Sequence, residues 1–156
     1  MAKAYFAAGC FWGVQQRFSR LPGVTDTRVG YMGGSMQSPD YRSVCTGHTG
    51  HAEVVEVEYD PNEVDYQTLL SCFFEWHDPT QVNRQGPDIG TQYRTAVFPQ
   101  TDAQRSETQS KIAEMNASGR YSQPIATTIE QSDTFWPAED YHQHYLDKRG
   151  LGHCGI

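Results

Sequence analysis

The order in which strand-like and helical segments follow one another is the feature that most constrains the fold. Apolar or alternating patterns predict strands over 3–9, 51–61 and 93–98, and one or two short strands over 125–137. Helical spacing predicts helices over 11–21, 64–78, 101–119 and 138–150. The first of these helices ends at Pro22 and Gly23, and the third is capped by a threonine. Strands and helices are mixed without a regular βαβ rhythm. This order favours an α+β fold over a doubly wound parallel sheet.

Length and charge narrow the class of protein. A chain of 156 residues fits one domain, 1–156, and its net charge of −7 comes from 19 acidic and 12 basic residues that are scattered along it. Nucleic acids and anionic membranes need a basic footprint, so neither is expected as a partner. The start, MAKAYFAAGCFWG, is not typical of a secretory signal, and no apolar run approaches the roughly 20 residues of a membrane span. We therefore expect a cytoplasmic protein.

Cys10 lies in an unusual setting for a cysteine. It follows Gly9 and precedes Phe11 and Trp12, at the expected turn from the first strand into the first helix. The unpaired amides and the positive dipole at a helix start favour a thiolate. Two interpretations stay open at this point, a reactive cysteine and a thiol that is simply buried at a turn.

The strand over 51–61 carries a carboxylate in an unexpected phase. Val55, Val57 and Tyr59 alternate on one face, Glu56 and Glu58 point the other way, and Glu53 falls on the side of the valines. Desolvation there is expected to raise the pKa of Glu53, which would keep it protonated enough to act as an acid.

The other cysteines and the histidines have competing interpretations. Cys72 lies on the apolar stripe of its predicted helix and is expected to be a buried, inert thiol. Cys154, flanked by glycines in the tail, is either a second thiol that reaches a distant first one or an incidental exposed cysteine. The remaining candidates lie in the glycine-rich, irregular segment 30–50 and in the last predicted helix: Cys45, His48, His51, His142 and His144. Their spacings match no zinc-finger or His-Glu-x-x-His pattern, so no metal is expected.

Six blocks in order identify a family resemblance. GCFWG at 9–13, GYMGG at 30–34, YRSVCTGHTGHAEVVEVEYDP at 41–61, FFEWHDPTQ at 73–81, GTQYRTAVF at 90–98 and FWPAEDYHQHYL at 135–146 together resemble the A-type peptide methionine sulfoxide reductases. The resemblance covers essentially the whole chain. It implies a two-layer α+β sandwich with a mixed central sheet, flanking helices, a ferredoxin-like core and an irregular C-terminal tail.

The resemblance also implies a role for each matching residue. Cys10 matches the catalytic cysteine and Cys154 a recycling cysteine. Phe11 and Trp12 match the aromatic pocket for the substrate's methyl group. The polar residues expected around the sulfoxide oxygen are Tyr41, Glu53, Asp88 and Tyr93.

The implied activity is reduction of methionine S-sulfoxide, in proteins, peptides or the free amino acid, to methionine. It would pass through a Cys10 sulfenic acid and a Cys10–Cys154 disulfide that a thioredoxin-like dithiol reduces, with no cofactor, in a monomer. Three alternatives remain to be tested: a Cys-His hydrolase using His51 or His142 as base, a binding module for oxidised peptides without turnover, and a metal protein.

Overall fold

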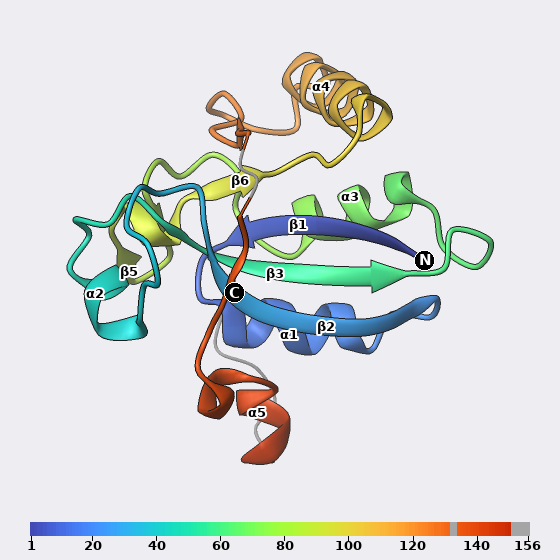
Figure 1. Cartoon of the computed structure of the whole chain (residues 1–156). Coiled ribbons are helices and arrows are strands. Elements are labelled where there is room, and N and C mark those ends of the chain that lie inside the picture. The colour runs from blue at the N-terminus through green and yellow to red at the C-terminus, as the bar shows by residue number, and fades with distance from the viewer. Residues whose placement is uncertain (132–133, 151–156) are drawn as a thin grey trace.

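Two interleaved strand–helix–strand units form the centre of the molecule. The computed structural model describes residues 1–131 and 134–150. Strands β1 (Ala2–Ala8), β2 (Val24–Met32), β3 (Ala52–Tyr59) and β6 (Thr95–Val97) lie in the order β6-β1-β3-β2, each antiparallel to its neighbours. Helix α1 (Phe11–Ser19) connects β1 to β2, and α3 (Tyr66–Glu75) connects β3 to β6, so that each connection skips one strand (Figure 1). This is the ferredoxin-like order, and the α+β prediction is confirmed.

Two short strands extend this sheet at its edges. β7 (Thr128–Ile129) runs parallel to β6, and β8 (Trp136–Pro137) runs antiparallel to β2, which makes the sheet mixed as predicted. Helix α4 (Asp102–Ala117) packs outside α3, and the Thr101 hydroxyl caps it by accepting the Gln104 N–H at 3.1 Å. The remaining elements are short: α2 (Tyr41–Cys45), β4 (Arg84–Gln85), β5 (Asp88–Ile89), η1 (Thr91–Tyr93), η2 (Asp140–His142) and α5 (Tyr145–Lys148).

The main core lies between the sheet and its two crossover helices. Phe6 of β1 is fully buried, with its ring 5.2 Å from that of Phe18 in α1 and 5.1 Å from that of Phe73 in α3. Val55 and Val57 of β3 face the same core, as their alternation predicts. The ring of Phe6 therefore joins both crossover helices to β1.

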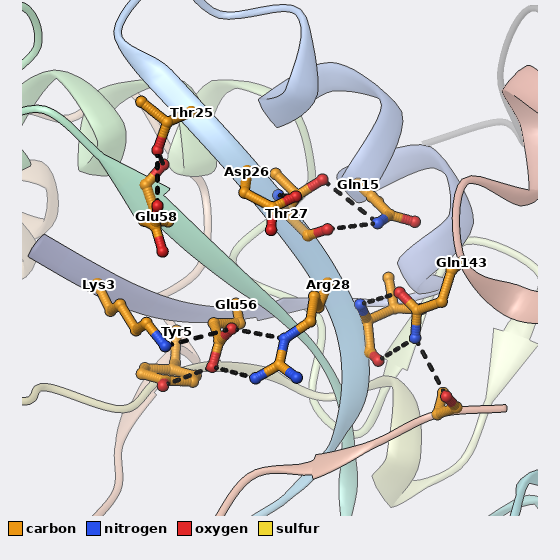
Figure 2. Close-up of polar contacts among 12 residues, drawn as sticks. Lys3, Tyr5, Gln15, Thr25, Asp26, Thr27, Arg28, Glu56, Glu58 and Gln143 are labelled. Atoms are coloured by element: carbon orange, nitrogen blue, oxygen red, sulfur yellow. Dashed lines mark hydrogen bonds and ion pairs between the residues drawn. The ribbon is translucent and has the colours of Figure 1, made fainter. Parts of the chain in front are cut away.

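The opposite face of the sheet holds a buried carboxylate that is paired with partly exposed cations. Glu56 lies directly across from Tyr5 on β1 and from Arg28 on β2. Its carboxylate accepts the Tyr5 hydroxyl at 2.7 Å and the Arg28 Nε–H at 2.9 Å, and Lys3 Nζ is 3.8 Å away (Figure 2). Burial opposes the charge of Glu56, but Arg28 and Tyr5 outweigh it and hold its pKa below the ordinary value. Glu56 thus points away from the helices as predicted, yet it is only 5% exposed because of these partners.

Three segments differ from the sequence-based expectation. Residues 24–32 form a strand, so the irregular segment begins after Met32, and residues 41–45 within it are helical. The predicted helix over 138–150 is divided into η2 and α5, because His144 adopts φ 53° and its N–H donates to Gln15 Oε1 at 2.7 Å. Among the described residues, no helix is both long and apolar enough to cross a membrane.

His77 links the end of α3 to β6. Its Nδ1 lies 2.6 Å from the Phe73 carbonyl oxygen and must donate to it, so Nε2 accepts the Thr95 hydroxyl at 2.8 Å. Burial lowers the pKa of His77 to about 4. The folded protein therefore holds this ring neutral at pH values where an unfolded histidine is already protonated.

This shift predicts a loss of stability in mild acid. Between pH 6.5 and pH 4 the unfolded chain binds the proton that the folded chain excludes, so His77 alone removes about 3 kcal/mol across that window and about 2 kcal/mol between pH 7 and pH 5. The free energy of unfolding is measured by urea denaturation at pH 7 and pH 5. The difference between the two pH values should be about 2 kcal/mol smaller in His77→Gln than in wild type. The exposed His48→Gln should keep the wild-type dependence, and an unaltered dependence in His77→Gln would contradict the assignment.

Candidate active site

Cys10 lies where β1 turns into α1. Gly9 adopts φ 87°, a conformation that favours glycine, and Cys10 takes the N-cap position of α1 with a half-buried side chain. The predicted strand-to-helix turn is confirmed. The sulfur is therefore next to the positive end of the α1 dipole, which favours the thiolate.

Glu53 lies beside the same helix end. Its side chain is 2% exposed, and Oε1 accepts the Phe11 N–H, the first amide of α1, at 3.3 Å. The phase of β3 therefore points this carboxyl to the α1 side of the sheet, as the alternation predicts. Because Phe11 follows Cys10 directly, the carboxyl and the thiol share one helix terminus.

Two tyrosines approach Glu53 from separate short elements. Tyr41 is the first residue of α2 and Tyr93 the last residue of η1. Burial, a hydrogen bond to Cys45 and the charge of Glu53 raise the pKa of Tyr41, while burial, Glu53, Cys45, Asp88 and Cys10 raise that of Tyr93. Both hydroxyls thus stay protonated at neutral pH and remain available as hydrogen-bond donors.

Asp88 reaches this group from the small hairpin β4–β5. Its side chain is half-buried, and its charge acts on the Tyr93 hydroxyl. The polar residues singled out in the sequence are thus near enough for the charges of Glu53 and Asp88 to act on Tyr93, and that of Glu53 on Tyr41.

Phe11 and Trp12 form an aromatic wall at the start of α1. Phe11 is 1% exposed, with its ring 5.8 Å from that of Tyr31. Trp12 is half-buried and stacks on Tyr145 of α5, with centroids 3.8 Å apart and planes 10° from parallel. Trp12 is thus a partly exposed apolar ring two residues from the cysteine, which suits a small apolar group, whereas Phe11 lies in the core.

Sequence reasoning missed how two residues support Tyr41. Cys45 lies one helical turn further along α2, and its sulfur accepts a hydrogen bond from the Tyr41 hydroxyl. Burial is the main cause that raises the pKa of the Cys45 thiol. Glu139 accepts the Tyr41 N–H at 3.0 Å with Oε2 and the Tyr31 hydroxyl at 2.9 Å with Oε1. The i, i+4 spacing of Tyr41 and Cys45 could have indicated the first contact had residues 41–45 been recognised as a helix.

Of the other sequence candidates, His142 packs on Tyr41, whereas His51 and Cys72 make different contacts. His51 is 2% exposed; its Nδ1 accepts the Gly34 N–H at 3.0 Å and its Nε2–H donates to the Met36 carbonyl oxygen at 2.7 Å. Cys72 is half-buried on α3, and burial raises the pKa of its thiol. Over residues 1–131 and 134–150 no three His, Cys, Asp or Glu side chains are grouped so as to hold a metal ion. Cys154 lies outside the described residues.

Comparisons with known proteins agree with this geometry. The family model "Peptide methionine sulfoxide reductase" matches residues 2–156. "Peptide methionine sulfoxide reductase MsrA" of Methanoculleus marisnigri is 55% identical over 154 residues, which are 99% of this chain and 94% of that protein. The crystal structure of Mxr1 from Saccharomyces cerevisiae in reduced form is 37% identical, with a TM-score of 0.90 over 98% of this chain and 88% of that chain.

A second Mxr1 structure, in complex with Trx2, aligns with a TM-score of 0.64 and 25% identity over 92% of this chain and 84% of that chain. This chain thus shares its sequence with the Methanoculleus marisnigri protein and its fold with reduced Mxr1 along nearly its full length. On that fold it carries a cysteine at a helix start, a buried carboxyl bonded to the next amide, and an aromatic wall. The chain belongs to the peptide methionine sulfoxide reductase family.

Proposed function

We propose that this protein reduces methionine S-sulfoxide, in proteins, peptides or the free amino acid, to methionine, and so repairs oxidised proteins. Membership of the family supports the reaction. The observation that carries the proposal is the shared helix terminus, where Cys10 caps α1 and the Glu53 carboxyl binds the next amide. A nucleophile and a proton donor at one helix end are what sulfoxide reduction requires.

The first step uses these two residues. The Cys10 thiolate attacks the sulfoxide sulfur and forms an S–S bond while Glu53 delivers a proton to the oxygen. The S–O bond of the substrate then breaks as the hydroxyl passes to the Cys10 sulfur, and the S–S bond breaks with its electron pair left on the substrate sulfur. Methionine and a Cys10 sulfenic acid result, so the substrate sulfur gains two electrons and the Cys10 sulfur loses two. The Tyr41 and Tyr93 hydroxyls donate hydrogen bonds to the oxygen as its negative charge grows, and Asp88 orients Tyr93 or a water molecule.

The aromatic wall selects the substrate's methyl group. Trp12 offers a half-buried apolar ring two residues from Cys10, and Phe11 packs behind it in the core, whereas Tyr41 and Tyr93 provide hydroxyl groups. A sulfoxide sulfur carries a methyl group on one side and an oxygen on the other, so such a site distinguishes the two epimers. The family resemblance of these residues supports the S epimer.

The second half of the cycle restores the thiol. The Cys154 thiol attacks the sulfenic acid, releasing water and forming a Cys10–Cys154 disulfide, which a thioredoxin-like dithiol then reduces by exchange. The structure of Mxr1 in complex with Trx2 supports a reductant of this class. A thioredoxin-like reductant also supports a cytoplasmic location.

We further infer that residues 1–156 act as one catalytic domain in a monomer. Cys10, Glu53, Tyr41 and Tyr93 are all supplied by a single chain. Light scattering at micromolar concentration should give a mass near 17.6 kDa, the mass of one chain. A dimer mass would contradict the monomer.

The histidine-dependent hydrolase is disfavoured. Both ring nitrogens of His51 are occupied by backbone groups, so this ring has no nitrogen with which to take a proton from Cys10. His142 Nδ1 accepts the Trp12 indole N–H, so the other ring nitrogen, Nε2, carries the proton of the neutral ring and cannot take one from Cys10. A hydrolase would also leave Cys154 without a function.

The proposal is tested by counting products in a single turnover. The pre-reduced protein is mixed with excess of each epimer of a blocked methionine sulfoxide, without added reductant, for wild type and Cys154→Ser. About one methionine per chain from the S epimer alone, with two thiols lost in wild type, is expected. Loss of all four thiols would bring both Cys45 and Cys72 into the relay. No product from either epimer would refute the reductase and favour the binding module.

A further inference from the structure

Trp12 is held on two sides by residues from the C-terminal part of the chain. Its ring stacks on Tyr145, and its indole N–H donates to Nδ1 of His142 at 2.9 Å. The stack fixes the plane of the indole but leaves it able to slide and turn within that plane. The hydrogen bond removes this freedom because an indole N–H donates in one direction only.

His142 is buried in an aromatic cluster. The residue is 1% exposed, and its ring centroid lies 4.4 Å from that of Tyr41, 4.1 Å from that of Tyr141 and 5.4 Å from that of Phe11. Its Nε2 is buried with no hydrogen-bond partner among the described residues. A buried polar atom without a partner destabilises the fold. An apolar ring would fill this space at lower cost, and among the described residues the hydrogen bond of this ring is made by Nδ1, with Trp12.

We propose that His142 is a positioning residue that sets the orientation of Trp12 and thereby the selectivity of the site for S-methyl over larger S-alkyl sulfoxides. The proposal rests on the proposed function, in which Trp12 is a wall of the methyl pocket. His142 acts through Trp12 and takes no part in proton transfer.

The protonation state of His142 fits this role. Nδ1 accepts a hydrogen bond only while it carries no proton, so the ring must be neutral with its proton on Nε2. Burial lowers the pKa of His142, and the nearby Glu139 offsets this only in part. The acceptor is therefore present throughout the neutral range.

The short helix η2, which ends at His142, also positions a residue on the polar side of the pocket. Glu139, the N-cap residue of η2, accepts a hydrogen bond from the Tyr41 N–H at the start of α2 and so positions Tyr41. The ring of Tyr41 packs on His142. His142 and Glu139 thus tie the methyl wall and the oxygen donor to one element. A change in His142 is expected to move the wall relative to the hydroxyl and to weaken recognition more than chemistry.

The contact can be observed without activity. In protein labelled with ¹⁵N-tryptophan, the indole N–H signal of Trp12 is assigned by its loss in Trp12→Phe. In His142→Phe, which keeps a ring but removes the acceptor, this signal should move upfield and exchange with solvent about tenfold faster. His142→Asn, whose Oδ1 can occupy the position of Nδ1, should restore slow exchange. The exposed His48→Phe is the matched control and should leave the signal unchanged.

Selectivity is measured as the ratio of kcat/KM for methionine and ethionine S-sulfoxides. His142→Phe should lower this ratio about tenfold through a higher KM for the methyl substrate, with kcat nearly unchanged, and His142→Asn should recover most of it. In a Trp12→Phe background, His142→Phe should add little, because the residue acts through the indole. His142→Gln, with its acceptor moved towards the Nε2 position, should behave like His142→Phe and serves if the latter does not fold.

The two proposals fail in different ways. An unchanged indole signal and an unchanged ratio in both His142→Phe and His142→Gln would overturn the role of His142. A wild-type protein that reduces neither sulfoxide would refute the proposed function, and the selectivity claim with it, while the indole signal would still decide whether His142 holds Trp12.

Discussion

Replacing Cys10 by serine should abolish methionine formation while leaving the fold intact. Serine is among the preferred N-cap residues, so α1 keeps its start, and the midpoint of thermal unfolding should stay within about 2 °C of wild type. The hydroxyl is a far weaker nucleophile than the thiolate and forms no sulfenic acid, so kcat/KM should fall about 10⁴-fold or more. Methionine released from the S-sulfoxide measures the effect.

The control for this prediction is a second cysteine on the same core. Cys72 lies half-buried on α3, away from the start of α1, and Cys72→Ser should retain the wild-type rate. Turnover by Cys10→Ser at a rate near wild type would show that another group attacks the sulfoxide.

Replacing Glu53 by glutamine should lower the rate of methionine release by about 10² to 10⁴-fold. The amide oxygen can still accept the Phe11 N–H, so the local structure is kept. It has no proton to deliver, so the sulfoxide oxygen must leave with a solvent proton. Rapid-quench measurement of the first turnover separates this step from recycling by Cys154.

Glu58→Gln is the matched change on the same strand. Glu58 lies on the other face of β3, where it accepts the Thr25 hydroxyl at 3.1 Å. This variant should be as active as wild type. A Glu53→Gln first turnover within about threefold of wild type would rule out Glu53 as the proton donor.

The central fold follows from local sequence patterns. Alternation in 51–61 and the apolar run over 3–9 each predict a strand correctly, because side chains in a strand point to opposite faces with period two. The turn at Gly9 and the cap at Thr101 were equally readable, since each depends on one residue type in one backbone conformation. The same patterns predicted that Glu53 faces the helices.

The second strand could not be recognised with the same ease. Thr25, Asp26 and Arg28 make its outer part polar, and only Thr27, Val29 and Tyr31 alternate with them. Its strand conformation depends on pairing with β3 and on the Arg28–Glu56 contact across that pairing. These partners are distant in sequence, so local propensity carries little information about them.

By itself the sequence determined which residues carry the proposed chemistry and which elements bear Cys10 and Glu53. Only the tertiary structure decided what surrounds them. Tyr41 and Tyr93 approach Glu53 from short elements with little stability of their own, and His142 meets Trp12 across 130 positions of the chain. Such contacts are set by how the sheet, its crossover helices and the C-terminal segment pack together, because packing joins residues by position in space while sequence patterns report only on near neighbours.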